Sequence, residues 1–415
     1  MTQYTPEWRV KINGYTVTDT TLTDLQITSG RQTIYEQPSA SYCTLNLICD
    51  CQTAIPYQIN DPITIEVKDT SGSYVVLFGG FVSDINAVVQ YAGSIKAMQY
   101  IRITGLGALA RLVRAIYQDN LSSDYDGDQI YALLSTVLLA TWQEVPGATT
   151  WATYDATTTW ENAGNTGLGE IDQPGDYDLD SQNNLNGSVY DIASAVANSG
   201  LGYLYEDSQG RIGYADSTHR AQYLATYGYT DLNARDAYGV GLEIAKRAGD
   251  VRNKISIIYG SAGNASVEDQ DDASIALYGQ LATTITTTLK NQQDAEDQAE
   301  FYLGIRAYPQ YEFQRIIFPL GNPDIDDNDR DALINVFMGQ PLNIQNLPPN
   351  WVNGEFQGFV EGWTWRAGVK GLTLDLTLSP IAYSLQAFRW NSVPATETWN
   401  TLSPTLDWLN ATIVA

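Results

Sequence analysis

The stretch EGWTWRAGVKGLTLDLTLSP, residues 361–380, decides the fold class of this 415-residue chain. In its second half Leu372, Leu374, Leu376 and Leu378 alternate without interruption with Thr and Asp. A period of two places such leucines on one face of a β-strand, with the polar residues on the other face. Together with the apolar segment from Phe356, this stretch predicts a closing pair of strands.

The same alternation runs through the N-terminal region. Val10 and Ile12 precede an Asn13-Gly14 pair, which is a strong hairpin signal, and further apolar residues alternate after it. Cys43 to Cys49 and the segment 63–67 repeat the pattern, and an apolar run follows at 75–82. Many short strands at this spacing are typical of a β-sandwich or a β-barrel.

Between the strands the period changes from two to that of a helix. Helices are predicted at 128–142, 188–198, 291–307 and 329–337, and a hairpin is predicted at 202–215. Further strands are expected at 254–259 and 311–319. We therefore predict a mainly β (α+β) fold with two β blocks, 1–110 and 241–385, and helical insertions at 111–240 and about 266–308.

The chain is acidic, and its charge is uneven. The formal net charge is −26, and no Lys or Arg occurs between Arg114 and Arg211, where 15 Asp and Glu lie. A chain with this charge has little electrostatic attraction for nucleic acid or for an anionic membrane. The acidic stretch is either a solvated surface or a lining that repels a DNA backbone.

A 22-residue segment occurs twice, at 142–163 and at 390–411, with ten identical positions. The repeats contain six of the ten tryptophans, at a spacing of nine: Trp142, Trp151, Trp160, Trp390, Trp399 and Trp408. Because each buried Trp removes about 150–250 Å² from water, we expect both segments to dock onto another surface. The first repeat lies in an acidic arm that we predict at 142–186. The second lies in a C-terminal arm that we predict at 386–415. The alternative is a pair of arms folded back on their own subunit.

Residues for catalysis or for binding metals are scarce. Cys43, Cys49 and Cys51 lack the spacing of a zinc site and are interpreted as buried thiols. The only histidine, His219, has no partner signature and is expected at the surface. The apolar run 130–140 is too short to span a bilayer, so no stable membrane insertion is expected. We predict no enzyme, no cofactor and no metal site.

Two motifs imitate binding sites. Gly105-Leu106-Gly107-Ala108-Leu109-Ala110 has the Gly-x-Gly-x-x-Ala spacing of a dinucleotide site, but it ends a β block instead of opening a βαβ unit, so a tight strand-to-helix turn is expected. The segment 324–328 imitates half of a calcium loop without its Gly and Glu. The Asp residues at 124–128 and 176–180 also lack the rest of a calcium loop. All three segments are therefore interpreted either as helix caps or as an irregular calcium site.

Several stretches in a fixed order resemble the hub proteins, or minor tail proteins, of long-tailed phages, which are related in fold to the baseplate hub of contractile tails. These stretches are RVKINGYTVTDTTLTDLQITSGRQ, ASYCTLNLI, ITIEVKDTSGSYVVLFGGFVSDI, YLYEDSQGRIGYAD, VRNKISIIYG, DASIALYG and EGWTWRAGVKGLTLDLTLSP. The Trp repeats are not part of this resemblance.

The resemblance implies two tube-type β-barrels, at 1–110 and 241–385, in a homotrimer at the tail tip of a virion. It implies contacts with a distal tail protein ring, a tape measure protein and tail fibre or spike proteins, with DNA only in transit through the lumen. A carbohydrate-binding adhesin and a tail-associated peptidoglycan hydrolase remain as alternatives.

Overall fold

The computed structural model describes residues 4–18, 21–34, 36–49, 56–89, 99–141, 171–238, 242–260, 263, 265–349, 354–368 and 371–384. The six tryptophans of the two repeats lie outside these ranges, as does the arm predicted at 386–415.

The N-terminal block consists of strands. In chain order they are β1 (Trp8–Ile12), β2 (Tyr15–Thr16), β3 (Thr21–Gly30), β4 (Tyr42–Cys49), β5 (Pro62–Lys68), β6 (Tyr74–Val89) and β7 (Gln99–Leu106). The predicted hairpin at Asn13-Gly14 is confirmed: Ile12 pairs with Tyr15, and both turn residues have positive φ, 52° and 78°. These angles match the type I′ turn, whose twist suits the flanking strands.

The C-terminal block supplies the rest of the main sheet. Its strands are β15 (Glu243–Lys246), β19 (Tyr311–Pro319), β20 (Pro341–Gln345), β21 (Phe356–Gly368) and β22 (Gly371–Pro380), and β14 (Thr230–Asn233) pairs with β20. The predicted closing pair is confirmed as β21 and β22. The short helix α8 (Asp327–Ile334) and the 3-10 turn η3 (Ile381–Tyr383) accompany these strands.

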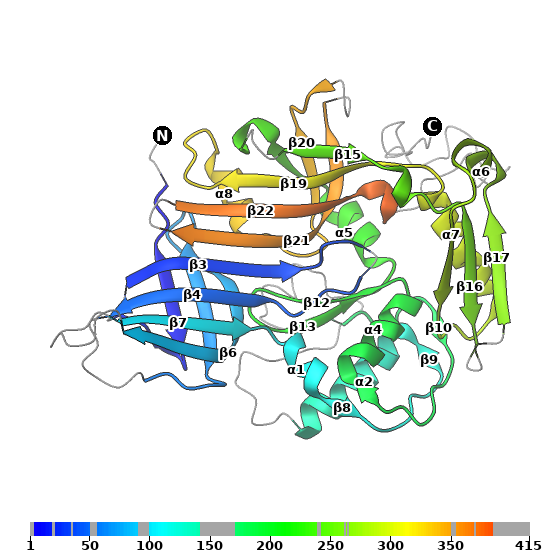
Figure 1. The fold of residues 1–415 in the computed structure, drawn as a ribbon, viewed down its shortest axis with the longest axis horizontal. Helices are drawn as coiled ribbons and strands as arrows, with labels where there is room; N and C mark the ends of the chain where they lie inside the picture. The colour runs from blue at the N-terminus through cyan, green and yellow to red at the C-terminus, as the bar shows by residue number, and fades with distance from the viewer. Residues whose placement is uncertain are drawn as a thin grey trace.

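The two β blocks form one continuous sheet (Figure 1). β21 of the second block lies antiparallel to β3 of the first, from Gly362↔Gly30 to Gly368↔Asp24. The strand order is β15-β19-β22-β21-β3-β4-β7-β6-β5-β1-β2. The expected mainly β fold is confirmed, and among the described strands no hydrogen-bonded ladder closes either block into a complete barrel.

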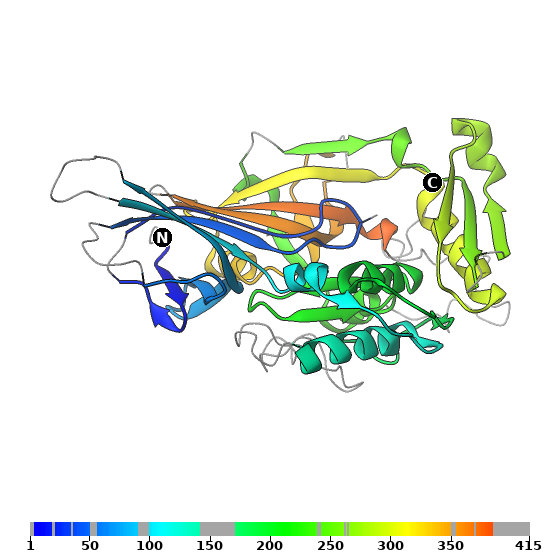
Figure 2. The ribbon, with the colours of Figure 1, turned by 60° about the horizontal axis from the view of Figure 1, so that its bottom comes forward.

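The insertions pack below the long sheet and beside its end. Their helices are α1 (Leu109–Arg114), α2 (Asp126–Thr141), α4 (Val189–Ser199), α5 (His219–Tyr227), α6 (Asp272–Tyr278) and α7 (Gln292–Arg306), with 3-10 turns η1 (Ala234–Asp236) and η2 (Ala248–Asp250). Their strands are β8 (Ile116–Tyr117), β9 (Asp124–Tyr125), β10 (Asp178–Leu179), β11 (Gly187–Ser188), β12 (Tyr203–Glu206), β13 (Ile212–Ala215), β16 (Lys254–Tyr259), β17 (Ala265–Gln270) and β18 (Ala282–Thr286). Figure 2 shows the long sheet with α1, α2 and α4 below it.

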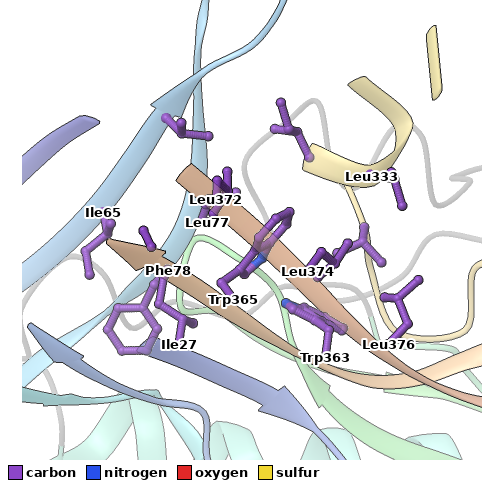
Figure 3. Packing of buried hydrophobic residues seen from close by; sticks show 14 of the residues in the cluster. Ile27, Ile65, Leu77, Phe78, Leu333, Trp363, Trp365, Leu372, Leu374 and Leu376 are labelled. Carbon is purple, nitrogen blue, oxygen red and sulfur yellow. The ribbon is translucent and has the colours of Figure 1, made fainter. Parts of the chain in front are cut away.

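Two hydrophobic cores hold these parts together. One runs under the long sheet and joins both β blocks, with Ile27 and Phe78 from the first and Trp363, Trp365 and Leu374 from the second (Figure 3). The other fills the insertions and combines α2 and α4 with α7 and β16, so segments far apart in sequence share one interior. In the described part of the chain no helix is long and apolar enough to cross a membrane.

The seam between the blocks predicts the effect of a glycine substitution. Gly30 ends β3 with φ +83°, and a Cβ there would lie 2.3 Å from the carbonyl oxygen of Glu361 on β21. Gly30→Ala should therefore lower the free energy of unfolding by more than the roughly 1–2 kcal/mol of left-handed strain alone, measured by urea denaturation. Gly72→Ala is the matched control, because Gly72 has φ +87° and no heavy atom within 4 Å. Equal losses in both variants would contradict the close approach of β3 and β21.

Candidate functional site

The two faces of the long sheet differ in chemistry. Leu25, Leu45 and Leu374 represent the face that is buried in the core. The opposite face carries hydroxyl and amide side chains that are exposed or half-buried: Gln26, Thr28, Thr44, Asn46, Asn86, Thr104, Thr364, Thr373 and Thr377. At the seam the Oγ1 atoms of Thr28 and Thr364 lie 3.2 Å apart. The polar sheet face, as we call this surface, therefore continues across both β blocks.

Charges on the polar sheet face nearly cancel. Apart from buried Glu361 and from Glu312 near the start of β19, the strands β19, β22, β21, β3, β4, β7 and β6 carry three bases and three acids: Arg102, Arg315, Arg366, Asp24, Asp84 and Asp375. The Nη2 atom of Arg315 lies 2.6 Å from Oδ2 of Asp375, and Nε of Arg102 donates to Asn46 at 3.2 Å. With the half-buried Glu312 included, the face has three bases and four acids, so it is polar and close to neutral.

A buried carboxylate lies under the seam. Glu361 occupies an irregularity between β21 and β22, where the register shifts, and is 1% exposed. Its Oε2 accepts from Nε of Arg31 at 2.6 Å and from Nη2 of Arg220 at 3.0 Å. Its Oε1 accepts from Nη1 of Arg220 at 2.8 Å and from the Ser379 hydroxyl at 2.6 Å. Glu361 thus joins the end of β3, helix α5 and both closing strands.

The electrostatics of this junction favour the ionised form. Burial alone would raise the pKa of Glu361, but the guanidinium groups of Arg220 and Arg31 outweigh it and lower the pKa to about 2. The Arg220 guanidinium also lies 4.6 Å from the ring centre of Tyr203 on β12. Removing one partner from such a buried pair typically costs about 3–5 kcal/mol, because the other charge stays buried without compensation.

A second buried carboxylate explains the glycine-rich motif at 105–110. Glu206 at the end of β12 accepts from the backbone N–H of Ser41 at 2.7 Å and from that of Leu109 at the start of α1. A Cβ on Gly107 would lie 2.3 Å from a Glu206 carboxylate oxygen. The motif forms the strand-to-helix turn that the sequence predicts, and this side chain fills the space beside the turn.

His219 corrects one expectation. It was predicted at the surface, but it is 6% exposed, and its Nδ1 lies 2.6 Å from Oδ2 of Asp172. The neighbouring Asp126 is fully buried and accepts from the backbone N–H groups of Asp176 and Tyr177 and from the Tyr214 hydroxyl. The prediction was wrong because the partners of His219 come from a loop 47 residues away.

The aspartate motifs serve the fold. Asp326 caps α8 by accepting from the backbone N–H of Asp329 at 2.9 Å, as the capping alternative predicted. Asp126, from the motif at 124–128, organises the loop at 176–177. Within the described ranges, no group of three or more His, Cys, Asp and Glu side chains is arranged to hold a metal ion. Cys43 is a buried free thiol, as predicted, whereas the side chains of Cys49 and Cys51 lie outside the description.

The sequence did not reveal the Glu361 junction. Arg31, Arg220 and Glu361 are separated by more than 100 residues, so no local spacing connects them. The one local signal was a glutamate inside the otherwise apolar strand FQGFVEGWTW. The candidate interface residues Trp142, Trp151, Trp160, Trp390, Trp399 and Trp408 lie outside the described residues and stay a prediction.

The buried carboxylates predict how stability depends on pH. Burial raises the pKa of Asp126 from 3.8 to about 7, and burial likewise raises that of Glu206 to about 7. A carboxyl group whose pKa is higher in the folded state stabilises the fold at low pH. This stabilisation is lost as the pH rises through the folded-state pKa. The unfolding free energy should therefore fall between about pH 4.5 and 7, on the order of 1 kcal/mol per group and pH unit.

Asp126→Asn tests this expectation, because the amide keeps the shape of the side chain and removes its titration. Urea unfolding across the pH series should give a shallower slope for the variant than for the parent chain. Asp119→Asn, at an exposed position, is the control and should keep the parent slope. An unchanged slope in Asp126→Asn would show that this carboxyl group does not titrate with a raised pKa.

Comparisons with known proteins agree with this fold. No protein-family model and no curated protein matches the sequence. The 43 kDa tail protein of prophage MuSo2 from Shewanella oneidensis is 10% identical, with a TM-score of 0.57 over 91% of this chain and 99% of that chain. The tail protein from Neisseria meningitidis MC58 is 12% identical, with a TM-score of 0.58 over 92% of this chain and 98% of that chain. The resemblance inferred from the sequence is confirmed at the level of structure: the chain has the fold of these phage tail proteins.

Proposed function

We propose that the chain is a structural protein of a phage virion, a trimeric hub at the tail tip that continues the tail tube. The fold shared with two tail proteins over more than nine tenths of the chain supports a tail component. Two β blocks joined in one sheet support the trimer, because three such chains supply six similar sheet sections around an axis. Such a ring can continue a sixfold tube.

The polar sheet face is the proposed wall of the channel. Lysine or arginine on a channel wall would bind phosphates and release their counterions, which holds the DNA in place. On this face the charges nearly cancel, and hydroxyl and amide groups fill the remaining positions. DNA that passes through the channel therefore contacts a surface that forms hydrogen bonds with water. This surface has no net electrostatic attraction for phosphate. This arrangement is the observation that carries the proposal.

The proposed partners follow from the place of a hub. A distal tail protein ring would lie above it, a tape measure protein would occupy the lumen, and tail fibre or spike proteins would attach outside. The Trp repeats are proposed as arms that contact such neighbouring chains, since aromatic anchors carry a disproportionate share of binding energy. The domain boundaries at 110, 240 and 385 remain part of this proposal.

Adding positive charge to the polar sheet face tests the proposed channel wall. The triple variant Thr28→Lys, Thr44→Lys, Thr104→Lys should assemble into particles but release DNA more slowly, and added salt should relieve the delay. The matched control replaces the same three residues with Glu, because glutamate side chains also change size and polarity but do not attract phosphate. DNA release would be timed by dye fluorescence after receptor triggering. If both variants eject at the parent rate, this face does not line the channel.

The tryptophans of the arms should behave differently from those of the core. Trp151→Ala with Trp399→Ala should leave the subunit folded and weaken partner docking by about 30-fold or more, as expected for interface anchors worth 2 kcal/mol or above. Trp363→Ala should instead cost about 3–5 kcal/mol of stability, because Trp363 is 5% exposed in the core. Thermal unfolding and co-sedimentation with tail particles measure the two effects. A double variant that fails to fold would place the arms in their own subunit's interior.

A further inference from the structure

A cavity of about 690 Å³ lies between β6, α5 and β21. Its walls come from β6, the β12–β13 hairpin, α5, the end of α8 and β21, and seven of the 19 lining residues are aromatic. Trp363 and Trp365 lie on the strand β21, which Figure 3 shows beside Leu77 and Leu374. The volume falls within the range of about 300–1,000 Å³ that is typical of ligand pockets.

An aromatic cluster on α5 and after α8 lines part of the cavity. The ring centres of Tyr223 and Tyr227 lie 4.7 Å apart, and those of Tyr223 and Phe337 lie 5.4 Å apart in an edge-to-face arrangement. Tyr227 is 40% exposed, which is unusual for a ring that borders an apolar space. Further in, Leu77 and Met338 are buried and line the wall.

The cavity also contains polar groups with unmet hydrogen bonds. Arg211 lines it and is 3% exposed, and although one nitrogen of its guanidinium pairs with Asp207, its Nε and Nη1 have no hydrogen-bond partner among the described residues. Buried donors of this kind are costly unless they are satisfied. A peptide segment that enters the cavity would offer carbonyl oxygens to them, and the side-chain amides of Gln209 and Asn335 at the rim would accept an indole N–H.

The described chain ends in contact with α5, the helix whose Tyr223 and Tyr227 line the cavity. The hydroxyl of Ser384, the last described residue, accepts from Nη1 of Arg220 at 2.8 Å. Arg220, Tyr223 and Tyr227 fall on one face of α5 at a spacing of three and four residues, and Tyr227 lies about 10 Å further along the helix axis. Trp390 follows Ser384 by six residues, a reach of about 20 Å for an extended chain. A short connection also keeps the entropy cost of closure low.

We propose that this cavity is the seat of Trp390 from the C-terminal segment of the same chain. A cavity of about 150 Å³ accepts a benzene ring, so the larger space has room for an indole and part of its backbone. The indole would pack against the Tyr223, Tyr227 and Phe337 rings and cover the apolar wall. Seated there, Trp390 would fix the start of the arm and leave Trp399 and Trp408 to contact neighbouring chains.

Photo-crosslinking of the full-length protein tests the seat. With p-benzoylphenylalanine in place of Tyr227, irradiation should link position 227 to residues 385–415 of the same chain, identified by peptide mass spectrometry of the band at single-chain mass. The control places the same group at Tyr238, which is 47% exposed and does not line the cavity. Trp390→Ala should reduce the Tyr227 link by about tenfold, the ratio given by 1.4 kcal/mol of docking energy, while Trp408→Ala should leave it unchanged.

Three results would overturn the proposal. A link from position 227 to another chain would assign the cavity to a neighbouring copy or a partner protein. A yield no higher than that of the Tyr238 control would mean that the cavity has no peptide occupant. A link that survives Trp390→Ala would exclude this side chain as the anchor. Circular dichroism of each variant confirms that the comparison is made on folded protein.

Discussion

The pairing of β21 with β3, with Glu361 buried beneath it, is the constraint on which the rest of the structure depends. This one ladder turns two β blocks, which residues 111–240 separate in the sequence, into a single sheet. Glu361 then ties β3, β22 and α5 together through Arg31, Ser379 and Arg220. Burial disfavours the charge of Glu361, and the two guanidinium groups outweigh this effect. Removal of one partner should therefore destabilise the junction, because a buried charge would lose its compensation.

That constraint also creates the surface that we propose as the channel wall. Because β3 and β21 continue one another, the hydroxyl and amide side chains of both blocks lie on the same face, and the contact between Thr28 and Thr364 bridges the seam. If the two blocks formed separate sheets, their polar side chains would not share one continuous surface. Figure 2 shows α1, α2 and α4 on one side of the long sheet, and among the described residues the hydroxyl and amide side chains of the polar sheet face are exposed or half-buried.

Local sequence patterns predicted much of the fold, and their limits have physical causes. The alternation of Leu372, Leu374, Leu376 and Leu378 and the Asn13-Gly14 turn act within a few residues, so both strands and turn could be predicted. The β21–β3 ladder and the partners of His219 and Glu361 depend on segments far apart, which no local period encodes. Helix α5, with the sequence HRAQYLATY, was not among the predicted helices.

Imaging of the assembled particle tests the central claim most directly. If the chain is a trimeric hub, averaged electron micrographs of the tail tip should contain three copies around the axis, with the six sheet sections in a ring and the face that carries Thr28, Thr44 and Thr364 toward the channel. Six copies, a single copy, or a ring with this face turned away from the axis would contradict the account.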